Sequence, residues 1–101
     1  MRKAEFVAAA REEFLAEVVY YNTAQEGLGS EFAVAIEKTT ALALVFPEIG
    51  APFDSDTRRM IVKGFPFSLI YKPSTNGIVV FAVAHQSRQP GYWSSRVATG
   101  R

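Results

Sequence analysis

The C-terminal half of the chain carries four side chains that could act together on a phosphate group. Cleavage of RNA by its own 2′-hydroxyl needs a base, an acid and cations that stabilise the charged intermediate. Histidine ordinarily exchanges protons near neutral pH, and the chain has one histidine, His85. Together with Tyr92, Arg59 and Arg88 it could form such a set. The simpler interpretation, which we favour, is that His85 ends a strand and hydrogen-bonds the loop from Arg88 to Tyr92.

Composition excludes several other kinds of chemistry. The chain has no cysteine and a single histidine, which removes disulfides, thiol nucleophiles, cysteine zinc sites and histidine-rich metal sites. We therefore expect no metal and no cofactor. No apolar run approaches the roughly 20 residues of a membrane span, and Glu12 and Glu13 interrupt any apolar segment behind the basic N-terminus. These features predict a cytoplasmic chain with no signal peptide and no membrane partner.

The charges are divided unevenly along the chain, although the net charge is only +1. Residues 1–56 contain all ten acidic residues and four basic ones, a net charge of −6. Residues 57–101 contain no acidic residue and have a net charge of +7. The seven basic residues are Arg58, Arg59, Lys63, Lys72, Arg88, Arg96 and Arg101. Unless folding mixes the two halves, these side chains lack local partners and favour an external anion, either a phosphate backbone or an acidic protein segment.

Two consecutive helices are predicted in the N-terminal half. Apolar side chains recur at the spacing of one helix face over residues 7–21, with glutamates on the polar side, and this helix should end before Gly27 or Gly29. Ser30 is the expected N-cap of the second helix, and Pro47 is expected to end it. The short connection predicts an antiparallel helical hairpin.

The second half is predicted to form a sheet. Residues 47–57 have the composition of a loop. Three antiparallel strands are predicted at 59–63, 67–72 and 78–84. The last is too apolar for a half-exposed strand, so it should be central and covered on both faces. With a short edge strand at 3–7, the prediction is a single α+β domain over residues 1–101, in which the hairpin covers one face of the sheet. The tail after Ser87 is predicted as a loop or short turn.

Three stretches resemble the RelE/ParE superfamily of toxins, and most closely its ParE-like branch, the plasmid stabilization toxins. They are residues 19–22 (Val-Tyr-Tyr-Asn), residues 58–71 (Arg-Arg-Met-Ile-Val-Lys-Gly-Phe-Pro-Phe-Ser-Leu-Ile-Tyr) and residues 82–93 (Ala-Val-Ala-His-Gln-Ser-Arg-Gln-Pro-Gly-Tyr-Trp). Their order and spacing fit the superfamily over nearly the whole chain. The resemblance implies a strand, two helices and a three-strand meander.

The resemblance also implies partners. Such toxins are held inactive, in a hetero-oligomer, by a cognate antitoxin, here expected to be a ParD-like ribbon-helix-helix protein whose flexible, often acidic segment wraps the toxin. The residues expected to bind partners are Arg58, Arg59 and Lys63 for the antitoxin, and Arg88, Tyr92, Trp93 and Arg96 for the target. Arginine, tyrosine and tryptophan dominate binding hot spots. Tyr92 and Trp93 are interpreted first as packing anchors of the tail rather than as a platform for stacked bases.

Two activities occur in this superfamily. RelE-like members cleave messenger RNA on the ribosome, whereas ParE-like members bind and poison DNA gyrase. Where the RelE pattern has two arginines, this chain has Ser68 and Gln86. Two missing cations would remove several kcal/mol each of transition-state stabilisation. The sequence therefore predicts a gyrase-binding toxin. The alternative is a ribosome-dependent endoribonuclease that uses Arg59, His85, Arg88 and Tyr92, with Glu48 as an available carboxylate. A plain nucleic-acid-binding module ranks third because the net charge is low.

Overall fold

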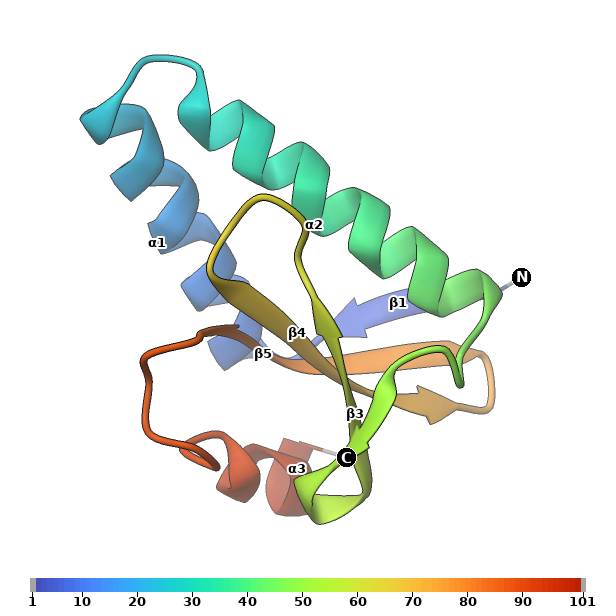
Figure 1. Cartoon of the computed structure of the whole chain (residues 1–101). Coiled ribbons are helices and arrows are strands. Elements are labelled where there is room, and N and C mark those ends of the chain that lie inside the picture. Colours follow the sequence, from blue (N-terminus) through green and yellow to red (C-terminus); the bar gives the residue numbers. More distant parts are fainter. Residues whose placement is uncertain (1, 101) are drawn as a thin grey trace.

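A helical hairpin lies on one face of a five-stranded sheet, and a short C-terminal helix lies on the other face (Figure 1). The computed structural model describes residues 2–100, so Met1 and Arg101, the last basic residue counted above, lie outside the described residues. The helices are α1 (Ala8–Ala24), α2 (Leu28–Val45) and α3 (Ser94–Gly100). The strands are β1 (Lys3–Phe6), β2 (Ala51–Phe53), β3 (Thr57–Ile61), β4 (Phe67–Ser74) and β5 (Gly77–His85). The predicted α+β class is confirmed.

The sheet has the strand order β1-β5-β4-β3-β2. β3, β4 and β5 form the predicted antiparallel meander, and β1 pairs with β5 in parallel, with Lys3 opposite Gly77 and Phe6 opposite Val80. β5 is therefore an inner strand, and all its residues except His85 are buried. This confirms the expectation that the most apolar segment is central and covered on both faces.

The turn between α1 and α2 corrects the predicted helix start. Ser30 is not the N-cap; α2 begins at Leu28, and its N-cap is Gly27, whose φ of 88° lies in the left-handed region. Asn22 of α1 replaces the expected serine, because its Oδ1 accepts a hydrogen bond of 2.7 Å from the backbone N–H of Gly29. A side chain from one helix thus satisfies a free N–H at the start of the next. The sequence-based prediction missed this because the partner lies seven residues away.

Residues 47–57 contain regular structure where a loop was predicted. β2 adds an outer strand to β3, and a 3-10 turn follows at Asp54–Asp56. Tyr71 of β4 fixes this segment: its hydroxyl donates to the Pro47 carbonyl (2.8 Å) and accepts from the Gly50 N–H (3.1 Å). β2 has only three residues, with Pro52 inside it and Gly50 directly before it, and both residue types disfavour a strand. Long-range contacts such as those of Tyr71 therefore hold this segment in place.

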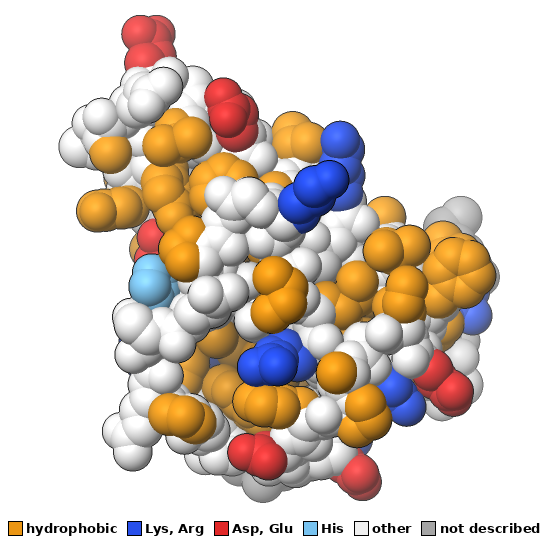
Figure 2. Space-filling view, viewed as in Figure 1, with side chains coloured by type: hydrophobic (Ala, Val, Ile, Leu, Met, Phe, Trp, Pro, Cys, Tyr) orange, Lys and Arg blue, Asp and Glu red, His pale blue; other side chains and the backbone are white. Residues whose placement is uncertain are grey.

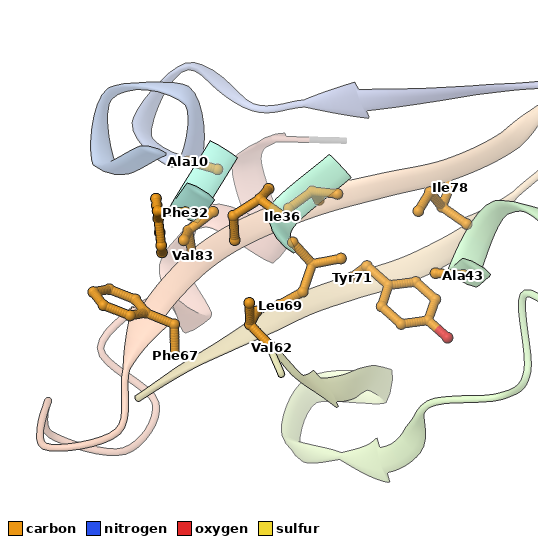
Figure 3. Close-up of a cluster of buried hydrophobic side chains, with 11 residues drawn as sticks. Ala10, Phe32, Ile36, Ala43, Val62, Phe67, Leu69, Tyr71, Ile78 and Val83 are labelled. Atoms are coloured by element: carbon orange, nitrogen blue, oxygen red, sulfur yellow. The ribbon is translucent and has the colours of Figure 1, made fainter. Parts of the chain in front are cut away.

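The buried side chains form two clusters, one on each face of the sheet. The larger lies between the helical hairpin and the sheet (Figure 3) and includes Phe32, Leu69 and Tyr71. The smaller lies under the tail and consists of Ile70, Ala82, Ala84 and Trp93. Alternation along β4 and β5 sends successive side chains to opposite faces. The C-terminal tail, predicted as a loop or turn, therefore forms the second layer and ends in α3.

Candidate functional site

A cavity of about 330 Å³ opens between the sheet and the C-terminal tail. We call it the tail pocket. It is lined by Phe53, Arg59, Ile61, Ser68, Ile70, Ala84, His85, Gln86, Arg88, Gln89, Pro90, Tyr92 and Trp93. Figure 2 shows a hollow with hydrophobic side chains in its floor and a basic side chain lying over it. The four residues proposed above for phosphate chemistry, Arg59, His85, Arg88 and Tyr92, all line this pocket although they come from different segments.

Strand alternation separates the basic residues of β3. Arg59 faces the tail pocket, whereas Arg58 points to the other side, where it donates hydrogen bonds to the carbonyls of Glu48 (3.0 Å) and Gly50 (2.7 Å). Lys63 lies beyond the strand, in a groove beside α2. Arg58, Arg59 and Lys63, which we expected to bind the antitoxin together, therefore do not share one face, because neighbouring strand residues point in opposite directions.

Trp93 anchors the tail to the sheet. Its side chain is 2% exposed, and its ring lies 5.7 Å from the Phe53 ring between centroids. It packs in the same cluster as Ile70, Ala82 and Ala84. The interpretation of Trp93 as a packing anchor agrees with this placement. Little of its ring reaches the surface, so any contact with a partner is limited to the part of Trp93 that lines the tail pocket.

Glu13 of α1 joins the tail to the sheet, and the sequence-based prediction missed this role. One carboxylate oxygen accepts from the backbone N–H of Val83 (3.0 Å). The other accepts from the Tyr92 hydroxyl (2.7 Å) and from the guanidinium of Arg96 (2.9 Å). Arg96 also donates to the carbonyl of Phe81 (3.0 Å). Arg96 is thus engaged within the fold, which argues against its expected place on the target surface. The only feature of the sequence that pointed to Glu13 was its place on the polar face of the first helix.

The environment of Tyr92 keeps its hydroxyl protonated. Burial raises the pKa of Tyr92 well above its usual range, and the hydrogen bond to Glu13 raises it further. A phenol with a raised pKa remains a hydrogen-bond donor at neutral pH. Because its proton already points at Glu13, Tyr92 is poorly placed to remove a proton from a substrate.

The hydrogen bonds of His85 fix its tautomer. The backbone N–H of Ser87 donates to Nδ1 of His85 (3.0 Å), and the Ser87 hydroxyl lies 2.8 Å from the same nitrogen. Nδ1 is therefore the acceptor, and the ring proton is assigned to Nε2. In this state the ring offers a donor rather than a free basic nitrogen. His85 ends β5 as predicted, but its ring binds Ser87 rather than the predicted loop from Arg88 to Tyr92.

The tail pocket keeps two free cations. The guanidinium of Arg59 lies 4.9 Å from the Phe53 ring centroid, and that of Arg88 lies 3.8 Å from the Tyr92 centroid. Neither guanidinium makes a hydrogen bond or ion pair with a side chain or backbone group that the structure describes. Ser68 and Gln86, the positions without the RelE-like arginines, line the same pocket.

Glu48, considered above as a catalytic carboxylate, does not line the tail pocket. It lies in the loop after α2, beside the exposed apolar side chains of Val45, Phe46 and Ile49. None of the described residues that line the tail pocket is acidic. The site therefore combines an apolar floor with guanidinium groups and neutral polar groups, an arrangement suited to holding an anionic ligand.

Comparison with known proteins places the chain in a family. A family model described as the ParE toxin of the type II toxin–antitoxin system parDE matches residues 5–90. One chain of a solved structure described as the chromosomal ParDE TA system from P. aeruginosa superposes with a TM-score of 0.62 and 13% identity, over 84% of this chain and 96% of that chain. At that identity the likeness shows the fold. No curated protein sequence matches significantly. Among residues 2–100, no helix is long and apolar enough to cross a membrane. The chain belongs to the ParE family of toxins of type II toxin–antitoxin systems.

Proposed function

We propose that this toxin acts in the cytoplasm by binding a target protein through the tail pocket, and that the target is DNA gyrase. The choice of gyrase rests on the resemblance to ParE-like toxins. The binding mode is inferred from the contacts of the four candidate side chains in the pocket. Tyr92 and His85 are committed to Glu13 and Ser87, whereas Arg59 and Arg88 are exposed and have no internal anion. Such a site favours recognition over proton transfer.

We propose that a ParD-like antitoxin neutralises the toxin in a hetero-oligomer. The solved ParDE system at 13% identity supports this choice of partner. So does the surface of the hairpin, where large apolar side chains are exposed: Leu15 by 53%, Val19 by 66% and Val34 by 46%. Lys63 and Lys38 line a groove between α2 and β3. This groove is the proposed path for an acidic antitoxin segment, in place of a face that combines Arg58 and Arg59.

The proposal is tested with purified toxin in gyrase supercoiling and DNA-cleavage assays. The double variant Arg59→Gln with Arg88→Gln should abolish inhibition, and His85→Ala should retain it. Deleting the tail is a poor test, since it would remove Trp93 from the core. Arg11→Gln removes one exposed charge from α1, away from the residues that line the tail pocket, and serves as the matched control. Full inhibition by the double variant would contradict the proposed binding mode, and no effect of the wild-type toxin on gyrase would exclude gyrase.

A RelE-like ribonuclease is the second candidate, favoured by the convergence of Arg59, His85, Arg88 and Tyr92 on one pocket. Nuclease activity requires that the bound substrate releases His85 and Tyr92 from their present hydrogen bonds. Mapping messenger-RNA ends on ribosomes after toxin induction distinguishes the two. Ribosome-dependent cuts that disappear in His85→Ala or Tyr92→Phe would establish the nuclease in place of the gyrase-binding toxin.

A further inference from the structure

The tail pocket lacks an anion to match its cations. The guanidinium groups of Arg59 and Arg88 are held against the Phe53 and Tyr92 rings at 4.9 and 3.8 Å, which restricts their motion and leaves their N–H edges free. A guanidinium fixed in this way is already oriented to bind a carboxylate or a phosphate. None of the described lining residues is acidic, although Glu13 and Glu17 lie with Arg88 in an adjacent groove. An anion that binds inside the tail pocket would therefore come from another molecule.

The floor of the same pocket is apolar. Ile70, Ala84 and Trp93 form it, and each is at least 92% buried. Ser68, which is 6% exposed, lies among the lining residues, and its hydroxyl makes no hydrogen bond to the part of the chain that the structure describes. A cavity of about 330 Å³ is at the small end of ligand pockets, which span about 300–1,000 Å³. The site therefore fits one large apolar side chain better than an extended molecule.

Acidic side chains near the pocket disfavour a nucleic-acid strand. Asp54 and Asp56 follow Phe53 directly, in the 3-10 turn that contacts α3. Figure 2 shows acidic side chains at the edge of the molecule just below the hollow. A strand carries one phosphate per nucleotide and would bring further negative charges past these carboxylates. Arg96, which could have offset them, is paired with Glu13.

We propose that the tail pocket binds an acidic peptide segment, in which one large apolar side chain enters the pocket and a neighbouring carboxylate on each side binds Arg59 and Arg88. This inference rests on the proposed function and adds the chemistry of the target segment. The apolar side chain contacts the floor formed by Ile70, Ala84 and Trp93. The carboxylates supply the anions that the two guanidinium groups lack.

Trp93 provides the assay, because it is the only tryptophan in the chain and it lines the pocket. The full-length toxin is titrated with a blocked peptide of sequence Gly-Ser-Asp-Phe-Asp-Ser-Gly while tryptophan emission is recorded. We expect saturable binding that weakens with added salt. Replacing either Arg59 or Arg88 by glutamine should raise the Kd about tenfold, the size expected for one lost charge-assisted hydrogen bond. Arg11→Gln, an exposed arginine of α1 that does not line the tail pocket, should leave the Kd unchanged.

Two matched peptides and one nucleic acid complete the test. The peptide with both aspartates replaced by asparagine tests the charges, and the peptide with alanine in place of phenylalanine tests the apolar floor. Equal binding of either one, or no binding of the acidic peptide, would overturn the inference. The inference would also be overturned if a short RNA oligonucleotide bound more tightly than the acidic peptide and if the same arginine variants abolished that binding. If gyrase inhibition depends on Arg59 and Arg88 while the acidic peptide fails to bind, the proposed function stands and this inference is wrong.

Discussion

The hydroxyl of Tyr92 donates to the carboxylate of Glu13 at 2.7 Å, which joins the first helix to the C-terminal tail across 79 residues of sequence. Arg96 binds the same carboxylate oxygen at 2.9 Å. The tail side of the molecule is thereby fixed to α1, and the residues that line the tail pocket acquire a defined position.

Removing the Glu13 carboxylate should loosen the tail without unfolding the hairpin. Glu13→Ala leaves the Val83 N–H, the Tyr92 hydroxyl and the Arg96 guanidinium without their acceptor, and hydrogen bonds to charged groups contribute about 1.5–3 kcal/mol each before partial exposure is considered. We expect a loss of about 2 kcal/mol in urea unfolding and a red shift of tryptophan emission. Glu12→Ala, at an exposed neighbour, is the control, and equal stability of the two variants would contradict this role for Glu13.

Tyr92 should make the folded protein sensitive to alkali. Its pKa is raised in the folded state, so above its ordinary pKa, about 10, the unfolded chain loses the phenolic proton while the folded chain retains it. This contribution to stability is complete below about pH 10 and declines as the pH rises further. Tyr92→Phe should therefore lose less stability than the wild type between about pH 10 and 11. Tyr21, whose pKa is also raised, contributes equally to both proteins and cancels in the comparison. Parallel pH profiles would show that Tyr92 titrates normally.

Trp93 should be the most costly single truncation on the tail side. Its ring fills the smaller core cluster, and removal of a buried tryptophan side chain costs about 3–5 kcal/mol. We expect Trp93→Ala to unfold the tail and to abolish target binding together with it. Trp93→Phe retains an aromatic ring against Phe53 and should recover most of the stability. Thermal melting followed by circular dichroism measures both, and a small effect of the alanine variant would mean that the tail is not part of the cooperative unit.

Gly29→Ala should destabilise the hairpin although alanine is the better helix former. A Cβ at this position would lie 2.3 Å from the Val18 carbonyl oxygen and 2.6 Å from Cγ of Asn22, so the two helices would have to separate. We expect a net loss of about 1–3 kcal/mol in denaturant unfolding, as for other overpacked sites. A Cβ at Gly27 would meet no neighbouring atom, so Gly27→Ala tests only the strain of a φ of 88°. We expect this strain to lower the free energy of unfolding by about 1–2 kcal/mol. Stabilisation by Gly29→Ala would show that the helices separate easily.

Periodicity predicted the elements that the chain specifies locally. The apolar repeat of α1 and α2 and the apolar run of β5 are visible in sequence because each has a whole face, or two faces, to bury. β2 and α3 were missed for the opposite reason, because both depend on contacts that are distant in sequence. Tyr71 of β4 holds the segment before β2, and Trp93, just before α3, packs against Ile70 of β4. Among the candidate site residues, Arg59, His85, Arg88 and Tyr92 line one pocket, and their functional role stays a prediction. The role of Glu13 was not predicted, since its three partners all lie at least 70 residues further along.

The parallel pairing of β1 with β5 has a consequence for biosynthesis. β1 pairs with β5, from Lys3 opposite Gly77 to Phe6 opposite Val80. β1 therefore has no strand to pair with until β5 has been translated. Until then the helical hairpin has no complete sheet to cover Phe32, and isolated helices of this length are marginal in water. The native state therefore forms late, as one step of high contact order.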